Sequence, residues 1–151
     1  MLSVSLLGGF HLSLDQTQIT GLDTPRLQAL LAYLILHRDA PQSRAHLAFL
    51  FWPDTTESQA RTNLRNLLHH LRRALPNPDT YLDARVQTLQ WRSDAPYALD
   101  VADLHSVLAQ AEQAPGMRDS AAVREALERA VALYKGDLLP SCYDDWIIPQ
   151  R

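Results

Sequence analysis

The side chains best suited to chemistry lie between Glu57 and Leu75, in the segment ESQARTNLRNLLHHLRRAL. At helical spacing its leucines form one apolar face, and arginine, asparagine and histidine side chains cover the opposite face. After Glu57 the segment contains no acidic residue. Guanidinium and carboxamide groups bond bidentately to guanine and adenine edges, and arginine also neutralises phosphate. These side chains suit a helix in a DNA major groove; the alternative is an ordinary amphipathic surface helix.

The helical projection separates two groups of candidate contacts on this segment. Residues near the middle of the polar face are predicted to contact bases, namely Thr62, Asn63, Asn66, His70 and Arg73. Residues predicted to contact phosphates are Arg61, Arg65, His69 and Arg72, together with Arg85 in a later loop. For each of them the alternative is a side chain that is simply solvated.

No sequence motif for catalysis or metal binding is found. His69 and His70 are adjacent and diverge on a helix, and no cysteine or carboxylate lies at zinc-finger spacing. Asp144 and Asp145 have no nucleophile motif nearby, and there is no phosphate-binding loop. We therefore expect no enzyme activity, no catalytic residue, no metal ion and no cofactor.

Composition sets the class of protein. The chain has 151 residues, enough for one ordinary domain or two small ones. Its longest apolar run, Leu30–Leu36, is far too short for a membrane span, and its single cysteine excludes an internal disulfide. We expect a cytoplasmic protein without a membrane partner. Residues 1–93 carry nine basic and seven acidic residues, whereas residues 94–151 carry five and ten, which favours polyanion binding by the first part.

The elements that position the polar helix are predicted from local patterns. Residues 2–22 alternate at period two and predict three antiparallel strands, the third near residues 18–22. Thr24 and Pro25 begin a helix that ends near residue 37. Ser43 caps a second helix, which Trp52 and the following proline end.

The polar helix follows after a short turn. Asp54 and Glu57 predict a capping box at its start, and Pro76 ends it. Residues 81–91 then predict a hairpin with its tip at residues 83–85, where Arg85 and, at the base, Arg92 are possible phosphate contacts. Helix, turn, polar helix and hairpin are the order of a winged helix-turn-helix.

The remainder of the chain is predicted to be helical. A polar stretch from Ser93 to Ala98 sets the boundary between a first domain of residues 1–93 and a second of residues 98–151. Asp100 caps a helix to about residue 114, and Ser120 caps another that Gly136 ends. In the first of these helices the inward residues are predicted to be Val101, Leu104, Leu108 and Ala111. Such a pair is one tetratricopeptide-like hairpin, which needs neighbours, so the apolar group at residues 143–148 is expected to pack on further chain or on the first domain.

Several phrases, in order along the chain, resemble one protein family. They are LLGGF at 6–10, TPRLQALLAYLILH at 24–37, FWPD at 51–54, QARTNLRNLLHHLRRAL at 59–75 and LYKGDLLPSCYDDW at 133–146. With them the chain resembles the N-terminal part of SARP-type bacterial transcriptional regulators. The resemblance implies an α+β fold, with a winged helix-turn-helix followed by the start of a helical bacterial transcriptional activator domain that runs past residue 151.

The resemblance also implies a function and partners. The helix at 57–75 would enter the major groove of double-stranded DNA, and the helical domain would serve dimerisation or regulation. The expected partners are DNA, a second copy of the chain on repeated half-sites, and RNA polymerase. The sequence departs from the family in its hairpin, which lacks glycines and carries Asp83 at the predicted tip. The alternative function is a protein-binding module in which the arginines are only solvated.

Overall fold

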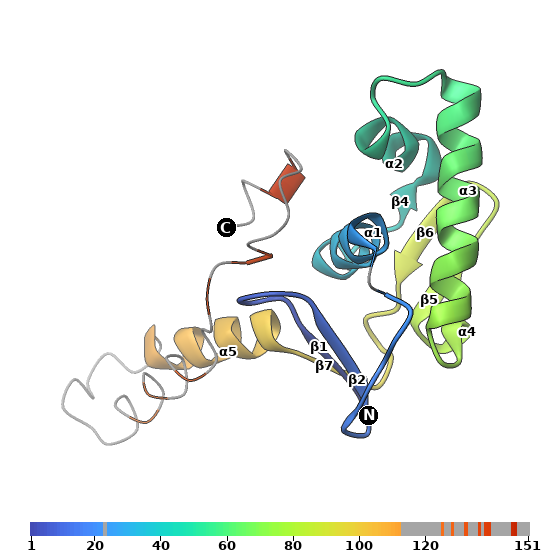
Figure 1. Ribbon diagram of the computed structural model, residues 1–151. Coiled ribbons are helices and arrows are strands. Elements are labelled where there is room, and N and C mark those ends of the chain that lie inside the picture. Colours follow the sequence, from blue (N-terminus) through green and yellow to red (C-terminus); the bar gives the residue numbers. More distant parts are fainter. Residues whose placement is uncertain are drawn as a thin grey trace. The chain divides into compact units, whose positions relative to one another are not determined.

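The computed structural model, shown in Figure 1, confirms the α+β class. It describes residues 1–22 and 24–112, and also the single residues Glu125, Glu128, Ala132, Gly136, Leu138, Leu139, Trp146 and Ile147. The chain divides into two compact units, one of residues 1–18 and 96–151 and one of residues 19–95. In the described part of the chain, no helix has the length and hydrophobicity required to cross a bilayer.

The first unit contains a four-stranded sheet in the order β3-β2-β1-β7. Its strands are β1 (Leu2–Ser5), β2 (His11–Leu14), β3 (Thr17–Gln18) and β7 (Tyr97–Leu99). The first three pair antiparallel, as predicted. The third strand is shorter and begins earlier than expected, because Asp15 and Gln16 take positive φ angles and reverse the chain immediately.

Strand β7 was not predicted, because it begins inside the polar stretch from Ser93 to Ala98 that was expected to be a domain boundary. They pair parallel to β1, with Leu2 beside Tyr97. The helix α5 (Asp100–Glu112) follows directly. The carboxylate of Asp100 accepts hydrogen bonds from the backbone amides of Leu6 and Leu7, the shortest at 2.9 Å, and so attaches the start of α5 to the end of β1.

The inward face of α5 differs from the prediction. Val107 is buried, whereas Leu108 is 39% exposed, so the apolar stripe runs through Val101, Leu104 and Val107 and not through Leu108. The side chain of Ala111 lies outside the described residues, as does most of the second predicted helix. The tetratricopeptide-like pairing therefore stays a prediction. Of the apolar group near the end, Trp146 and Ile147 are buried.

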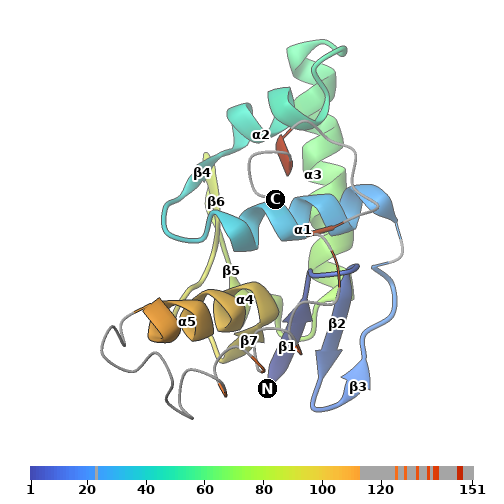
Figure 2. The same cartoon turned by 90° about the vertical axis from the view of Figure 1, so that its left-hand side faces the viewer.

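The second unit contains the predicted order of helix, turn, helix and hairpin. Its elements are α1 (Pro25–Leu36), β4 (Gln42–Ser43), α2 (Arg44–Phe51), α3 (Glu57–Ala74), α4 (Pro78–Tyr81), β5 (Leu82–Ala84) and β6 (Thr88–Trp91). Figures 1 and 2 show α1 crossing α3 and α2 lying beside the first half of α3. Leucines of α1 and α3 and the ring of Trp91 are buried in its core.

Two local predictions about α3 and its neighbours are corrected. Its N-cap is Thr56, whose hydroxyl accepts a hydrogen bond from the Gln59 amide at 3.2 Å, and not Asp54. Thr55 is held outside the helix, since its hydroxyl donates to the carbonyl of Trp52. After α3 the chain forms the short helix α4 before the hairpin, with Pro78 in its first turn, where a proline is tolerated.

The hairpin is also displaced relative to the prediction. Asp83 lies in strand β5 opposite Gln90, half-buried, and not at the tip. The tip is residues 85–87, where Val86 is 92% exposed. In addition, β4 pairs with β6, which attaches the start of α2 to the hairpin.

Candidate nucleic-acid interface

The polar face of α3 is exposed, as the sequence predicted. Ala60, Leu64, Leu68 and Leu71 are buried, at spacings of three and four residues. Of the predicted base contacts, Thr62, Asn66, His70 and Arg73 are exposed and Asn63 is half-buried. Of the predicted phosphate contacts on α3, Arg61, Arg65 and His69 are exposed and Arg72 is half-buried. The helix therefore presents all of these side chains on its solvent side.

Three of the four arginines of α3 share one flank of the helix. At about 3.6 residues per turn, Arg61, Arg65 and Arg72 fall on the same side of the polar face, whereas Asn63 and His70 fall on the other. The start of α2 and the β5–β6 turn lie on the arginine side, because Arg61 and Arg65 line a cavity with residues of both. The polar face thus has a cationic edge and an amide-bearing edge.

The middle of the polar face includes side chains without partners. Asn63 accepts a hydrogen bond from the Gln59 amide group at 2.8 Å, and the Thr62 hydroxyl donates to the Ser58 carbonyl at 3.1 Å. Within the described residues, the side chains of Asn66 and Arg73 make no hydrogen bond or ion pair. Their donors and acceptors are free for a ligand. The rings of His69 and His70 lie edge to face, 5.9 Å apart.

Most of the predicted phosphate contacts take part in ion pairs at the surface. Arg61 pairs with Glu57 at 2.8 Å, Arg72 with Asp79 at 2.6 Å, and Arg85 with Asp83 at 3.2 Å. Exposed pairs of this kind contribute about 0–1 kcal/mol, so a phosphate can replace the carboxylate at small cost. Arg65 has no ion pair within the described part of the chain.

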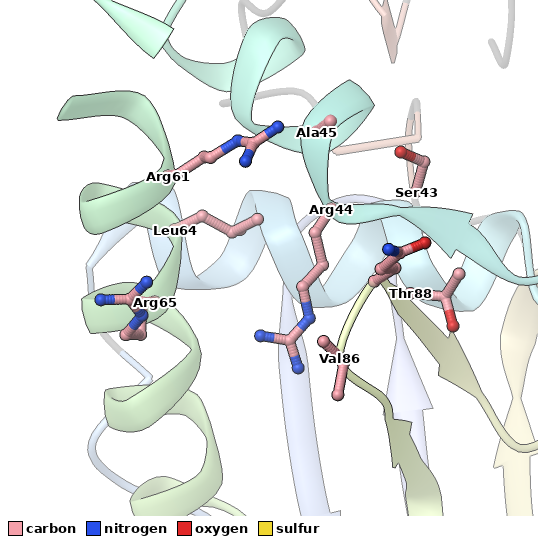
Figure 3. Close-up of a pocket in the computed structure, with 9 residues that line it drawn as sticks. Ser43, Arg44, Ala45, Arg61, Leu64, Arg65, Val86 and Thr88 are labelled. Carbon is pink, nitrogen blue, oxygen red and sulfur yellow. The ribbon is translucent and has the colours of Figure 1, made fainter. Parts of the chain in front are cut away.

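A further arginine, not predicted as a contact, is placed beside this flank. Arg44 is the first residue of α2, and its backbone amide donates to the Gln87 carbonyl at 2.9 Å. Figure 3 shows its side chain extending between α3 and the β5–β6 turn. It lines a cavity of about 470 Å³ with eight other residues, namely Ser43, Ala45, Arg61, Leu64, Arg65, Val86, Gln87 and Thr88.

The electrostatics of Arg44 are unfavourable in the protein alone. Its Nε atom is buried and has no hydrogen-bond partner among the described residues. Burial lowers the pKa of its guanidinium, and the positive charges of Arg65 and Arg72 lower that pKa further. A cation in the first turn of a helix also opposes the helix dipole, and the first turn of α2 has no acidic residue to compensate. An arginine in the first turn of a helix, where acidic residues are preferred, was the sequence signal that could have indicated Arg44 as a functional residue.

Across the described residues, histidine, cysteine and acidic side chains form no group of three that could hold a metal ion. The predicted contact residues of α3 carry guanidinium, amide, hydroxyl and imidazole groups, which suit hydrogen bonding and charge neutralisation.

Comparison with known proteins finds a likeness in structure. No protein-family model matches the chain, and no curated protein matches it. The fold is similar to a solved structure described as Mycobacterium tuberculosis EmbR in complex with a low-affinity phosphopeptide, with a TM-score of 0.80 and 22% sequence identity. The match covers 99% of this chain and 40% of EmbR, so this chain has the fold of a part of that protein.

Proposed function

We propose that this chain is a sequence-specific DNA-binding transcriptional regulator of the SARP type, with α3 in the major groove. Base contacts are assigned to Thr62, Asn63, Asn66, His70 and Arg73. Phosphate contacts are assigned to Arg61, Arg65, His69, Arg72 and Arg85. The likeness in fold to EmbR supports the architecture that this function needs.

The observation that carries the proposal is the exposed, acid-free face of α3 in its structural setting. The helix follows α2 after a short turn, precedes the β5–β6 hairpin and presents free amide and guanidinium groups at Asn66 and Arg73. Its 18 residues span about 27 Å, longer than the roughly 12 Å width of the major groove, so only part of the helix reads bases at once. The arginine flank is then left for phosphates on one groove wall.

Selection of bound sequences from a random duplex pool tests this function directly. We expect a short enriched motif, and Asn66→Ala or Arg73→Ala should each weaken binding to it by about 1–3 kcal/mol while relaxing preference at one position. Gln18→Ala, an exposed polar change in the sheet of the other unit, serves as the control. If the double variant bound the selected site as tightly as the wild type, α3 would not be the recognition helix.

A second copy of the chain is part of the proposal. One winged helix reads only a few base pairs, so useful specificity needs two copies on repeated half-sites. We assign that pairing to the helical part of the chain, and contact with RNA polymerase to the assembled regulator. If analytical ultracentrifugation found only monomers, with and without a two-half-site duplex, the proposed dimer would be refuted.

A protein-binding module is the second candidate, and one observation favours it. Phe49 on α2 is 67% exposed beside an apolar groove that it lines with Trp52 and Ala60. Large exposed aromatic side chains are typical of protein contacts. The two candidates separate in a salt series: failure to bind any duplex at low salt favours the module, whereas binding that weakens steeply with salt favours DNA.

A further inference from the structure

We propose that the cavity between the start of α2, the arginine flank of α3 and the β5–β6 turn seats one backbone phosphate of the bound duplex, with Arg44 as its principal ligand. The inference rests on the proposed function, because the phosphate belongs to the DNA that α3 reads. It adds a residue and a site that the amphipathic pattern of α3 does not contain.

The cavity has the charge and the donors for a phosphate. Three of its nine lining residues are arginines, and none is acidic. Arg44 and Arg61 reach it from different helices: Figure 3 shows the Arg61 side chain pointing from α3 toward α2, and the Arg44 side chain lying between α3 and the β5–β6 turn. Ser43 and Thr88 add hydroxyl groups, and Gln87 adds an amide. Arginine with neutral donors is the usual set of ligands for a phosphate oxygen.

The side chain of Arg44 is held ready for an anion and lacks one within the described part of the protein. Its backbone is fixed twice, by the first turn of α2 and by the hydrogen bond to Gln87. Its Nε–H is removed from water and unbonded among the described residues. An unbonded buried donor is costly, and for a charged group the cost is greater. An incoming phosphate would supply the missing acceptor and offset the repulsion from Arg65 and Arg72.

Size and position favour a duplex phosphate over a small free anion. A water molecule takes about 30 Å³ in the liquid, so about 470 Å³ accommodates a phosphodiester together with several waters. Arg61 and Arg65 line the cavity and also form the flank of α3. An anion in the cavity therefore lies at the edge of the recognition surface, where the groove wall would pass if α3 occupied the groove.

The test is the salt dependence of duplex binding by single-charge variants of the whole chain. Each phosphate contact contributes about 0.9 to the slope of log affinity against log salt concentration. Arg44→Gln should lower that slope by about 0.9, which reduces affinity about eightfold at 0.1 M salt. Arg44→Lys should keep the slope, since the charge remains. Arg38→Gln removes the same charge at the end of α1, outside the cavity, and should leave the slope unchanged.

A second variant keeps the test decisive if Arg44→Gln fails to fold. Arg65 is exposed, so Arg65→Gln should fold normally and also lower the slope by about 0.9. If both Arg44→Gln, folded by its melting curve, and Arg65→Gln kept the wild-type slope, the cavity would not seat a duplex phosphate. Loss of slope in Arg65→Gln alone, with folded Arg44→Gln unchanged, would likewise refute it.

Free phosphate is separated from DNA by a third measurement. Inorganic phosphate at matched ionic strength is titrated into the wild type and Arg44→Gln, with NMR detection of the arginine Nε–H groups. Phosphate binding that depends on Arg44, with duplex slopes unaffected by it, would assign the cavity to a free anion and overturn the inference. A wild-type chain that binds no duplex at low salt would instead refute the proposed function itself, and the inference with it.

Discussion

The position of Asp83 gives a prediction about the hairpin. Asp83 lies in β5 and pairs with Arg85 at 3.2 Å and more weakly with Arg92 at 3.8 Å. Replacing it by asparagine preserves the size of the side chain and removes the charge. Arg92 remains attached, because its Nε also donates to the Asp79 carbonyl at 3.1 Å. Asp83→Asn therefore releases one arginine, Arg85, whose side chain is 74% exposed at the tip.

The size of the effect follows from counterion release. In the wild type Asp83 competes with the phosphate for Arg85, so removing Asp83 adds at most about 0.9 to the salt slope, which at 0.1 M salt raises affinity by up to about eightfold. The stability of the fold should change little, because the arginine of the pair is exposed and a surface ion pair contributes only about 0–1 kcal/mol. We therefore expect Asp83→Asn to bind its duplex more tightly than the wild type at low salt, with the advantage disappearing as salt approaches about 1 M.

Fluorescence anisotropy with a labelled duplex, repeated across a salt series, measures both the affinity and the slope. The control is Asp94→Asn, which removes the same charge from an exposed residue that has no ion pair within the described part of the chain. Equal gains in the two variants would mean that only net charge matters. An unchanged slope in Asp83→Asn would show that the hairpin arginine does not approach the DNA backbone.

Three further changes test the fold and its pH dependence. Leu71→Ala, at a fully buried position of α3, should lower the free energy of unfolding by about 3 kcal/mol in urea denaturation, whereas Asn66→Ala on the opposite face should lower it by less than about 0.5 kcal/mol. Thr56→Ala removes the N-cap of α3 and should cost about 1 kcal/mol, while Asp54→Ala should cost less, and the reverse order would contradict the capping assignment. Burial lowers the pKa of His37; the positive charge of His46 lowers it further, and the negative charge of Asp39 partly offsets the decrease. The unfolded chain therefore binds a proton at position 37 more readily than the folded chain does. Stability should therefore fall as pH drops below about 6.5, and the fall should be smaller in His37→Gln; equal pH profiles would refute it.

Local chemistry predicted α1, α2 and α3 of the second unit because their signals are local. Ser43 caps α2 through its hydroxyl, and Pro25 begins α1, as the sequence indicated. The leucine spacing of α3 identified its buried face because a helix repeats every 3.6 residues regardless of its neighbours. The same spacing places Thr62, Asn66 and Arg73 on the solvent side, so the candidate base contacts on α3 could be predicted from the sequence.

Pairings between distant segments were not accessible in this way. The strands β4 and β7 have two and three residues, too few to show an alternating pattern, and each exists because a remote strand supplies its hydrogen bonds. The start of α3 was misassigned because Asp54 and Thr56 are both good capping residues. Only the turn after Trp52, held by Thr55, decides between them.

Arg44 was not predicted as a contact, because its role depends on its local position in α2 and also on packing between distant segments. Its first-turn position disfavours a cation, because the N-terminus of a helix carries partial positive charge. The β4–β6 pairing and the packing of α2 on α3 then place it beside Arg65, which increases the cost. Folding by itself gains nothing from this arrangement, since glutamine at position 44 could keep the same backbone hydrogen bond without the charge. An arrangement that lowers stability is expected where a bound ligand offsets the cost, and the ligand that offsets three arginines lining one cavity is an anion. The repulsion at this cavity is therefore the physical reason to place a phosphate there, and Arg44→Gln should raise stability in the absence of DNA while it weakens binding.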